Sequence, residues 1–354
     1  MAAHHRPGLA LWVYLDGKII KAAGYGFANL ELKVPVTPES VFHTESVAKI
    51  FTAISVMMLV EEGKVSLDDS ITKYFPEAPQ TWKPVKIRHL LTHTSGSPDY
   101  MEEEVDKFSA FINPRKDYTE DELLRALYAQ PLQFAPGDQR RYNNAGFVIL
   151  GALIRRVTGQ SWIDFQQKRI FQPLGMTATR IISEADIIPN RVSGYSLVEG
   201  EWKNPEWSAP SLSAVADGCL YSNVLDMAKW DAALYGEKLL KRSTLEQMLA
   251  PVTLNSGKTY PNGFAWLTED VNGHRLVYHD GEFNAFTTDL SRYLDDHLTI
   301  MIFTNLGVSD SFPKYLADKI GALYLPALAK KDDLTGTAAV MKANSSTRGV
   351  PASR

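Results

Sequence analysis

A serine and a lysine lie one helical turn apart in HTESVAKIFTAISVMMLVEEGKV, residues 43–65. This segment is apolar on nearly every face, which predicts a buried helix from Ser46 to Glu62. Burial and the positive helix N-terminus both favour the neutral form of Lys49. A neutral amine can accept the Ser46 proton and activate the hydroxyl as a nucleophile. The alternative is that Ser46 caps the helix and Lys49 extends its charge to solvent.

The S-x-x-K pattern occurs three times, so the pattern alone does not identify a site. Ser70 and Lys73 lie in a short polar segment, which predicts a surface turn or a helix cap. Ser311 and Lys314 lie around a proline at the start of a predicted helix, so Ser311 is expected to be its N-cap. Only Ser46 begins a long buried helix.

The Y-x-N pattern also occurs three times, beginning at Tyr142, Tyr221 and Tyr260. Tyr260 lies in the turn sequence YPNG, whereas the other two tyrosines precede predicted helices. A tyrosine can serve as a base if an adjacent ammonium lowers its pKa, but a single tyrosine is ordinarily a core aromatic. The pattern leaves both Tyr142 and Tyr221 as candidates.

His89 and His93 in HLLTHTSG have the spacing of a zinc-ligand pair on a helix. The glutamate of an H-E-x-x-H motif is absent, which favours histidines that bond to nearby backbone. The sequence also contains no nucleophile-elbow, Walker or dinucleotide-binding motif. It therefore indicates neither a metal nor a cofactor.

The composition points to an ordinary globular protein. Of the 354 residues, 45% are hydrophobic, and the chain has 37 Lys and Arg against 41 Asp and Glu. The sequence has no basic patch with interleaved aromatic residues of the kind that binds nucleic acid. It also has no apolar run of about 18 residues that would indicate a membrane span, and no signal-peptide pattern. A native start at Met1 implies a cytoplasmic protein, and a trimmed start implies a periplasmic or exported one. The oligomeric state stays open.

Strand patterns occur at both ends of the chain. GLALWVYL and IIKAAGYG flank an Asp-Gly turn, and hairpin-spaced strands return after Gly263. Because an isolated hairpin is marginally stable, we expect both sets in one antiparallel sheet flanked by helices, an α/β (α+β) fold. The predicted α/β lobe comprises residues 1–65 and 255–328, with a mostly helical lobe, 66–254, inserted. Residues 329–354 are expected to form a disordered tail.

Several segments in order resemble the serine β-lactamase and penicillin-binding protein superfamily, specifically its class C-like branch with family VIII carboxylesterases and D-amino-acid peptidases. They are TESVAKIFTAISVMMLVEEGKVSLDDSI, IRHLLTHTSGSPDY, FAPGDQRRYNNAGFVILGALIRRVTG and YHDGEFNAF. The resemblance implies a class C β-lactamase-like fold. It places S-x-x-K on Ser46 and Lys49, and Y-x-N on Tyr142 and Asn144, which makes Tyr221 a structural residue.

The resemblance places the third motif on His279, Asp280 and Gly281, with histidine where β-lactamases and transpeptidases have lysine. A neutral His279 is expected to donate a hydrogen bond to an ester or amide but to offer little to a carboxylate. Gly281 would let the backbone approach the substrate. The main-chain N–H groups of Ser46 and Glu282 would form an oxyanion hole.

The resemblance further implies that Ser46 forms an acyl-enzyme, which water hydrolyses. Lys49 and Tyr142 would act as a coupled proton-transfer pair, and Asn144 would hold Lys49 and a substrate amide or carbonyl. The expected activity is a cofactor-independent carboxylesterase for small uncharged acyl esters. The alternatives are a D-amino-acid peptidase or weak β-lactamase with the same site, and a non-catalytic penicillin-binding-like or sensor domain.

Overall fold

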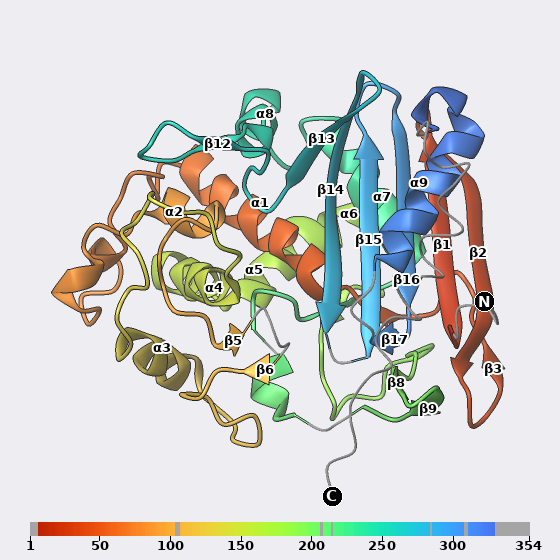
Figure 1. The fold of residues 1–354 in the computed structure, drawn as a ribbon, viewed down its shortest axis with the longest axis horizontal. Helices are drawn as coiled ribbons and strands as arrows, with labels where there is room; N and C mark the ends of the chain where they lie inside the picture. Colours follow the sequence, from red (N-terminus) through yellow and green to blue (C-terminus); the bar gives the residue numbers. More distant parts are fainter. Residues whose placement is uncertain are drawn as a thin grey trace, which may run out of the picture.

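The structure is a computed structural model that describes residues 6–102, 107–205, 208–213, 215–283, 285–307 and 311–329. One half is a seven-stranded sheet (Figure 1) in the order β13 (Leu267–Val271), β14 (His274–Phe283), β15 (Phe286–Tyr293), β16 (Leu298–Thr304), β1 (Gly8–Leu15), β2 (Lys18–Asn29) and β3 (Val34–Pro35). All of its neighbouring strands pair antiparallel. The predicted union of the N-terminal hairpin with the late strands is confirmed by the pairing of β1 with β16.

The interior strand β1 is apolar throughout because both faces of the sheet are covered there. Leu11 and Val13 belong to a core cluster with Ile320 of the closing helix α9 (Phe312–Tyr324). Trp12 points the other way into the main core. Figure 1 shows α9 lying along the sheet over β15 and β16, whereas α2, α3 and α4 lie beside the sheet in the other half of the molecule.

The rest of the described chain is mostly helical. Its other helices are α1 (Ala48–Glu61), α2 (Ile87–Leu91), α3 (Glu120–Tyr128), α4 (Asn144–Thr158), α5 (Trp162–Gln166), α6 (Gln172–Leu174), α7 (Val224–Leu234) and α8 (Arg242–Leu249). A π-helical turn lies at Gln167–Phe171, and 3₁₀ turns lie at Glu45–Val47, Ile71–Lys73, Gln80–Trp82, Pro210–Ser213 and Pro326–Leu328.

Short strands connect these helices. They are β4 (Phe42–His43), β5 (Met101–Glu102), β6 (Lys107–Phe108), β7 (Arg180–Ile181), β8 (Tyr195–Val198), β9 (Glu201–Lys203), β10 (Leu220–Ser222), β11 (Val252–Thr253), β12 (Thr259–Tyr260) and β17 (Leu306–Gly307). The lobe boundaries given above stay a prediction. Of the predicted tail, 329–354, all but Ala329 lies outside the described residues. Within the described part of the chain, no helix has both the length and the apolar character needed to cross a bilayer.

The helix that follows the nucleophile candidate is confirmed as buried, but its start is displaced. Ser46 lies in the 3₁₀ turn Glu45–Val47, and α1 begins two residues later at Ala48. The side chains from Ala48 to Leu59 are buried, and the turn after α1 contains Gly63 at φ 68°. The 3₁₀ turn packs against β14 and β15, and α1 packs against α4 and α5. Ser46 is therefore held where the helices meet the sheet.

Candidate active site

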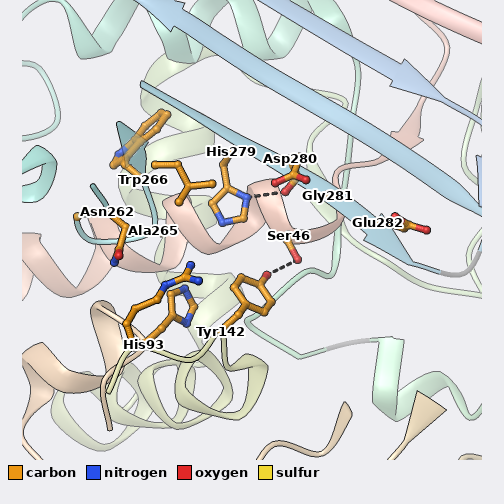
Figure 2. Close-up of a pocket in the computed structure, with 13 residues that line it drawn as sticks. Ser46, His93, Tyr142, Asn262, Ala265, Trp266, His279, Asp280, Gly281 and Glu282 are labelled. Carbon is orange, nitrogen blue, oxygen red and sulfur yellow. Dashed lines mark hydrogen bonds between the residues drawn. The ribbon is translucent and has the colours of Figure 1, made fainter. Parts of the chain in front are cut away.

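Three sequence-predicted residues meet at the Ser46 hydroxyl. Lys49 Nζ lies 3.0 Å from Ser46 Oγ, and the Tyr142 hydroxyl donates to the same oxygen at 2.7 Å. Lys49 follows one turn along α1, whereas Tyr142 comes from the segment just before α4. Figure 2 shows the Tyr142 ring pointing at Ser46 across the mouth of a pocket.

The other matches to the two motifs lie elsewhere. Ser70 caps a 3₁₀ turn by accepting from Thr72 N, which confirms its interpretation as a cap. Ser311 precedes α9 at the N-cap position, but its side chain makes no cap hydrogen bond. Tyr221 is buried on β10, where its ring lies 4.7 Å from the ring of His43. The structure therefore brings only the Tyr142 motif to Ser46.

Lys49 is fully buried and surrounded by acceptors. Its Nζ lies 2.8 Å from Asn144 Oδ1 and 2.6 Å from the main-chain oxygen of Asp217, in addition to the contact with Ser46. These three oxygens match the three N–H donors of an ammonium group.

The electrostatics agree with a charged Lys49. Burial lowers the pKa of Lys49, but the negative charges of Tyr142 and Asp217, when ionised, raise it by more, so the net pKa lies above its ordinary value. Burial raises the pKa of Tyr142, which keeps the phenol protonated near neutral pH. The raised pKa of Lys49 differs from the expected neutral amine, and because it depends on the ionised forms of Tyr142 and Asp217, the protons of Lys49 and Tyr142 belong to a coupled pair.

Asn144 is oriented by a residue that the motif search missed. The Asp99 carboxylate accepts from Asn144 N at 2.8 Å, from Asn144 Nδ2 at 3.2 Å and from Ala145 N at 3.2 Å. This fixes the amide so that its oxygen faces Lys49. Burial raises the pKa of Asp99 to about 6. The only signal in the sequence was its place in the segment SPDY.

Gly281 lets β14 approach the Ser46 turn. A Cβ at this position would lie 2.9 Å from Ser46 N, 2.8 Å from Glu45 Cβ and 2.6 Å from Thr288 Oγ1. β13 pairs with β14 only as far as Tyr278, so the following residues of β14 have no strand beside them on that edge of the described sheet. The predicted oxyanion donors, the N–H groups of Ser46 and Glu282, stay a prediction.

His279 is buried in the same wall but presents an acceptor. Its Nδ1 lies 2.5 Å from the main-chain oxygen of Asp280, which can only accept, so Nδ1 carries the proton. Burial lowers the pKa of His279 to about 4, so the ring is neutral and its Nε2 has a lone pair. Figure 2 shows this second nitrogen facing the pocket on the side of Tyr142. The expectation that His279 donates to substrate is therefore wrong.

The histidine pair of HLLTHTSG bonds to backbone, as expected. His89 Nδ1 accepts from Lys86 N and His93 Nδ1 accepts from Asn143 N, each at 3.1 Å. α2 ends at Leu91, so the two rings do not share a helix face. Among the described residues, no group of three or more His, Cys, Asp and Glu side chains could hold a metal ion.

Ser46 lies between two pockets. The larger, about 350 Å³, is lined by residues that include His93, Arg140, Trp266 and His279. The smaller, about 180 Å³, is lined by Lys49, Asn144, Asp217, Cys219 and Phe283 among others. Ser46, Tyr142 and Glu282 line both. This arrangement gives a substrate one pocket on each side of the nucleophile candidate.

The Ser46 hydroxyl lies within hydrogen-bond distance of a lysine and a tyrosine, between a helical region and the edge of an antiparallel sheet. This arrangement is that of serine β-lactamases and penicillin-binding proteins. The chain belongs to the Beta-lactamase family, whose family model matches residues 1–324. It is 29% identical over 304 residues to penicillin-binding protein 4* of Bacillus subtilis, which covers 82% of this chain and 66% of the relative. The chain spans less than two thirds of the length of the curated relatives it first matches, at 66% and 61%.

Solved structures agree in fold. The octameric penicillin-binding protein homologue from Pyrococcus abyssi superposes with a TM-score of 0.81 at 26% identity, over 99% of this chain and 80% of that one. The D-amino acid amidase from Ochrobactrum anthropi SV3 with D-phenylalanine superposes with a TM-score of 0.78 at 26% identity, over 92% of this chain and 95% of that one. The predicted fold class and superfamily are therefore confirmed.

The raised pKa of Asp99, about 6, predicts an acid limb in the activity. Below this pH the protonated carboxyl accepts fewer hydrogen bonds, which releases Asn144 from Lys49, so kcat/KM of the wild type for a short-chain ester should fall. The sign for stability is opposite. Because the folded pKa exceeds the unfolded value of about 3.9, the contribution of Asp99 to stability is present below that value and is lost as the pH rises through the folded pKa.

The matched variants are Asp99→Asn and Asp121→Asn. Asp99→Asn removes the titrating group, so its kcat/KM should be lower and flat across the acid range. Asp121 is exposed and paired with Arg155, so its variant should keep the wild-type limb. An acid limb that persists in Asp99→Asn would assign it to another group.

Proposed function

We propose that this protein is a serine hydrolase that forms an acyl-enzyme at Ser46 and acts as a carboxylesterase on small acyl esters. The observation that supports it most is the Ser46 hydroxyl within hydrogen-bond distance of both Lys49 Nζ and Tyr142, at 3.0 and 2.7 Å. A nucleophile and a base at such distances are the basic requirement for covalent catalysis. Two pockets that meet at Ser46 give the ester a place for each of its halves.

In the resting state Lys49 is an ammonium group and Tyr142 is a phenol, so both are protonated. The pair must lose one proton before it can act as a base. In the proposed mechanism, the pair that has lost this proton accepts the Ser46 proton while Oγ attacks the carbonyl carbon. The N–H groups of Ser46 and Glu282 receive the developing oxyanion, each such donor being worth about 3 to 4 kcal/mol. Tyr142 then protonates the leaving oxygen. Water hydrolyses the acyl-enzyme by the reverse proton transfers.

We assign the acyl group to the smaller pocket, because Asn144 lines it and is the proposed partner of the acyl carbonyl. Glu45, Asp217 and Glu282 also line this pocket with one cation, Lys49, so carboxyl groups outnumber ammonium groups there and disfavour an anionic acyl chain. A volume of about 180 Å³ fits a short chain. The leaving group then occupies the larger pocket beside Tyr142 and His279.

The same nucleophile could act on amides or β-lactams. The likeness to the D-amino acid amidase from Ochrobactrum anthropi SV3 favours this second candidate. Replacing an ester by an amide of the same acyl group separates the two, because an amine leaving group requires more complete protonation by Tyr142. A non-catalytic domain would process neither.

We expect a fluorophosphonate to add its mass once to the wild-type protein, at Ser46, because the Lys49–Tyr142 pair activates only this hydroxyl. Ser46→Ala should not be labelled, whereas Ser70→Ala, which changes a cap on a 3₁₀ turn, should be labelled as wild type. Intact-mass spectrometry reads out both. Steady-state rates should favour p-nitrophenyl butyrate over butyryl p-nitroanilide by at least about a hundredfold on the general-acid scale. Labelling of Ser46→Ala would contradict the nucleophile, and a faster anilide would favour the amidase.

The two tyrosines of the Y-x-N motif offer a matched pair. Tyr142→Phe removes the hydroxyl that lies 2.7 Å from Ser46 Oγ, so kcat/KM should fall at least about a hundredfold, the scale for a general acid or base. Tyr221→Phe removes a hydroxyl on β10, so the rate should stay within a few fold of wild type. Melting temperatures of both variants verify folding. The reverse ranking of the two rates would refute the role of Tyr142.

A further inference from the structure

The larger pocket contains a cation that the mechanism does not use. Arg140 lines this pocket together with Ser46 and is half-buried. Among the described residues, its guanidinium has neither an ion-pair nor a hydrogen-bond partner. Asp280 and Glu282 line the same pocket, but neither pairs with Arg140. A guanidinium offers five N–H donors in a planar fork that matches a carboxylate.

The neighbouring Arg141 shows that this arrangement is specific to one position. Arg141 is exposed, and its Nη1 donates to Gln133 Oε1 at 3.1 Å. It does not line the pocket. The two adjacent arginines therefore differ in environment. Arg141 is hydrogen-bonded at the surface, whereas Arg140 lines the pocket.

The two histidines of the pocket define how Arg140 can be used. Burial is the main cause that lowers the pKa of His93, and the positive charge of Arg140 is the second. The charge of Arg140 also lowers the pKa of His279, which burial lowers most. Both rings are therefore neutral. His93 Nδ1 accepts from Asn143 N, so His93 Nε2 carries the proton and is a donor, whereas His279 Nε2 is an acceptor. No described residue bonds to either Nε2.

We propose that Arg140, with His93 as a second donor, binds a carboxylate carried by the leaving group of the substrate. The inference rests on the proposed function, which puts the leaving group in this pocket. The preferred substrates are then esters between a short uncharged acyl group and an alcohol or phenol that bears a carboxylate. Arg140 supplies the positive charge that the neutral His279 does not.

The test compares two esters that differ only in the charge of the leaving group, 4-acetoxybenzoate and 4-acetoxybenzamide. The quantity is the ratio of their kcat/KM values, so that effects on the shared chemistry cancel. Arg140→Gln should lower this ratio by about ten- to a hundredfold, the range for loss of a charge-assisted hydrogen bond. Arg141→Gln should leave it unchanged, and Arg140→Lys should retain part of it.

An unchanged ratio in Arg140→Gln, or an equal loss in Arg141→Gln, would overturn the proposal. If the wild type hydrolyses neither ester, the proposed function fails and the anion site is tested by binding. Calorimetry then compares 4-hydroxybenzoate with 4-hydroxybenzamide on the wild type and both glutamine variants. Binding of the carboxylate that requires Arg140 but not Arg141 supports the site. Weak binding that is indifferent to Arg140 refutes it.

Discussion

The buried ammonium group of Lys49 is the interaction on which the rest of the site depends. A charge without solvent is tolerated only when its donors are satisfied, and leaving one unpaired costs several kcal/mol. The three acceptors of Lys49 come from the turn before α1, from the start of α4 and from the main chain at Asp217. The ammonium therefore ties these segments together, and the same contacts bring Ser46 and Asn144 to their places.

Two acids next to Lys49, the half-buried Asp99 and the buried Asp217, stabilise this arrangement. Asp99 holds the first N–H groups of α4, and the Asp217 carboxylate accepts a hydrogen bond from the Tyr100 hydroxyl. Burial raises the pKa of Asp217 as it does that of Asp99. After the ionised form of Tyr142, the charges of Asp217 and Asp99 are the next that raise the pKa of Lys49. The nucleophile region is thus a set of coupled titrating groups, and its protons belong to the set rather than to one residue.

Charge is distributed unequally on the two sides of Ser46. The smaller pocket is lined by three carboxyl groups and Lys49, whereas the larger one is lined by Arg140 and two neutral histidines together with Asp280 and Glu282. Under the proposed mechanism the acyl group of an ester occupies the smaller pocket and its leaving group occupies the larger one. The two halves of the substrate therefore meet different charges. The two proposals on substrate preference follow from this one asymmetry.

The sequence predicts much of the fold and the identity of the central residues, because both depend on local patterns. The strand patterns at both ends of the chain and the marginal stability of an isolated hairpin are enough to join the two ends in one sheet, and the family resemblance selects Tyr142 over Tyr221. What it does not predict depends on long-range contacts. The charge of Lys49 is set partly by Asp217, which lies 168 positions away, and the tautomer of His279 is set by a carbonyl whose direction only the folded strand defines.

The roles of Asp99 and Arg140 were missed for the same reason. Neither residue belongs to a motif with an explicit spacing. Each acquires its role from the groups that surround it in the folded chain: helix N–H donors for Asp99, and for Arg140 a pocket in which no described residue pairs with it.

The central claim, that Lys49 rests as an ammonium group, is tested most directly by NMR of protein labelled with ¹³C and ¹⁵N in its lysines. The Lys49 signal is the one that the Lys49→Arg variant lacks, and its ε-carbon shift reports the charge through a pH titration. The account predicts an ammonium shift up to at least about pH 9, as for an ordinary lysine with a pKa of about 10.4 or above. A shift of a neutral amine at about pH 7 would contradict it.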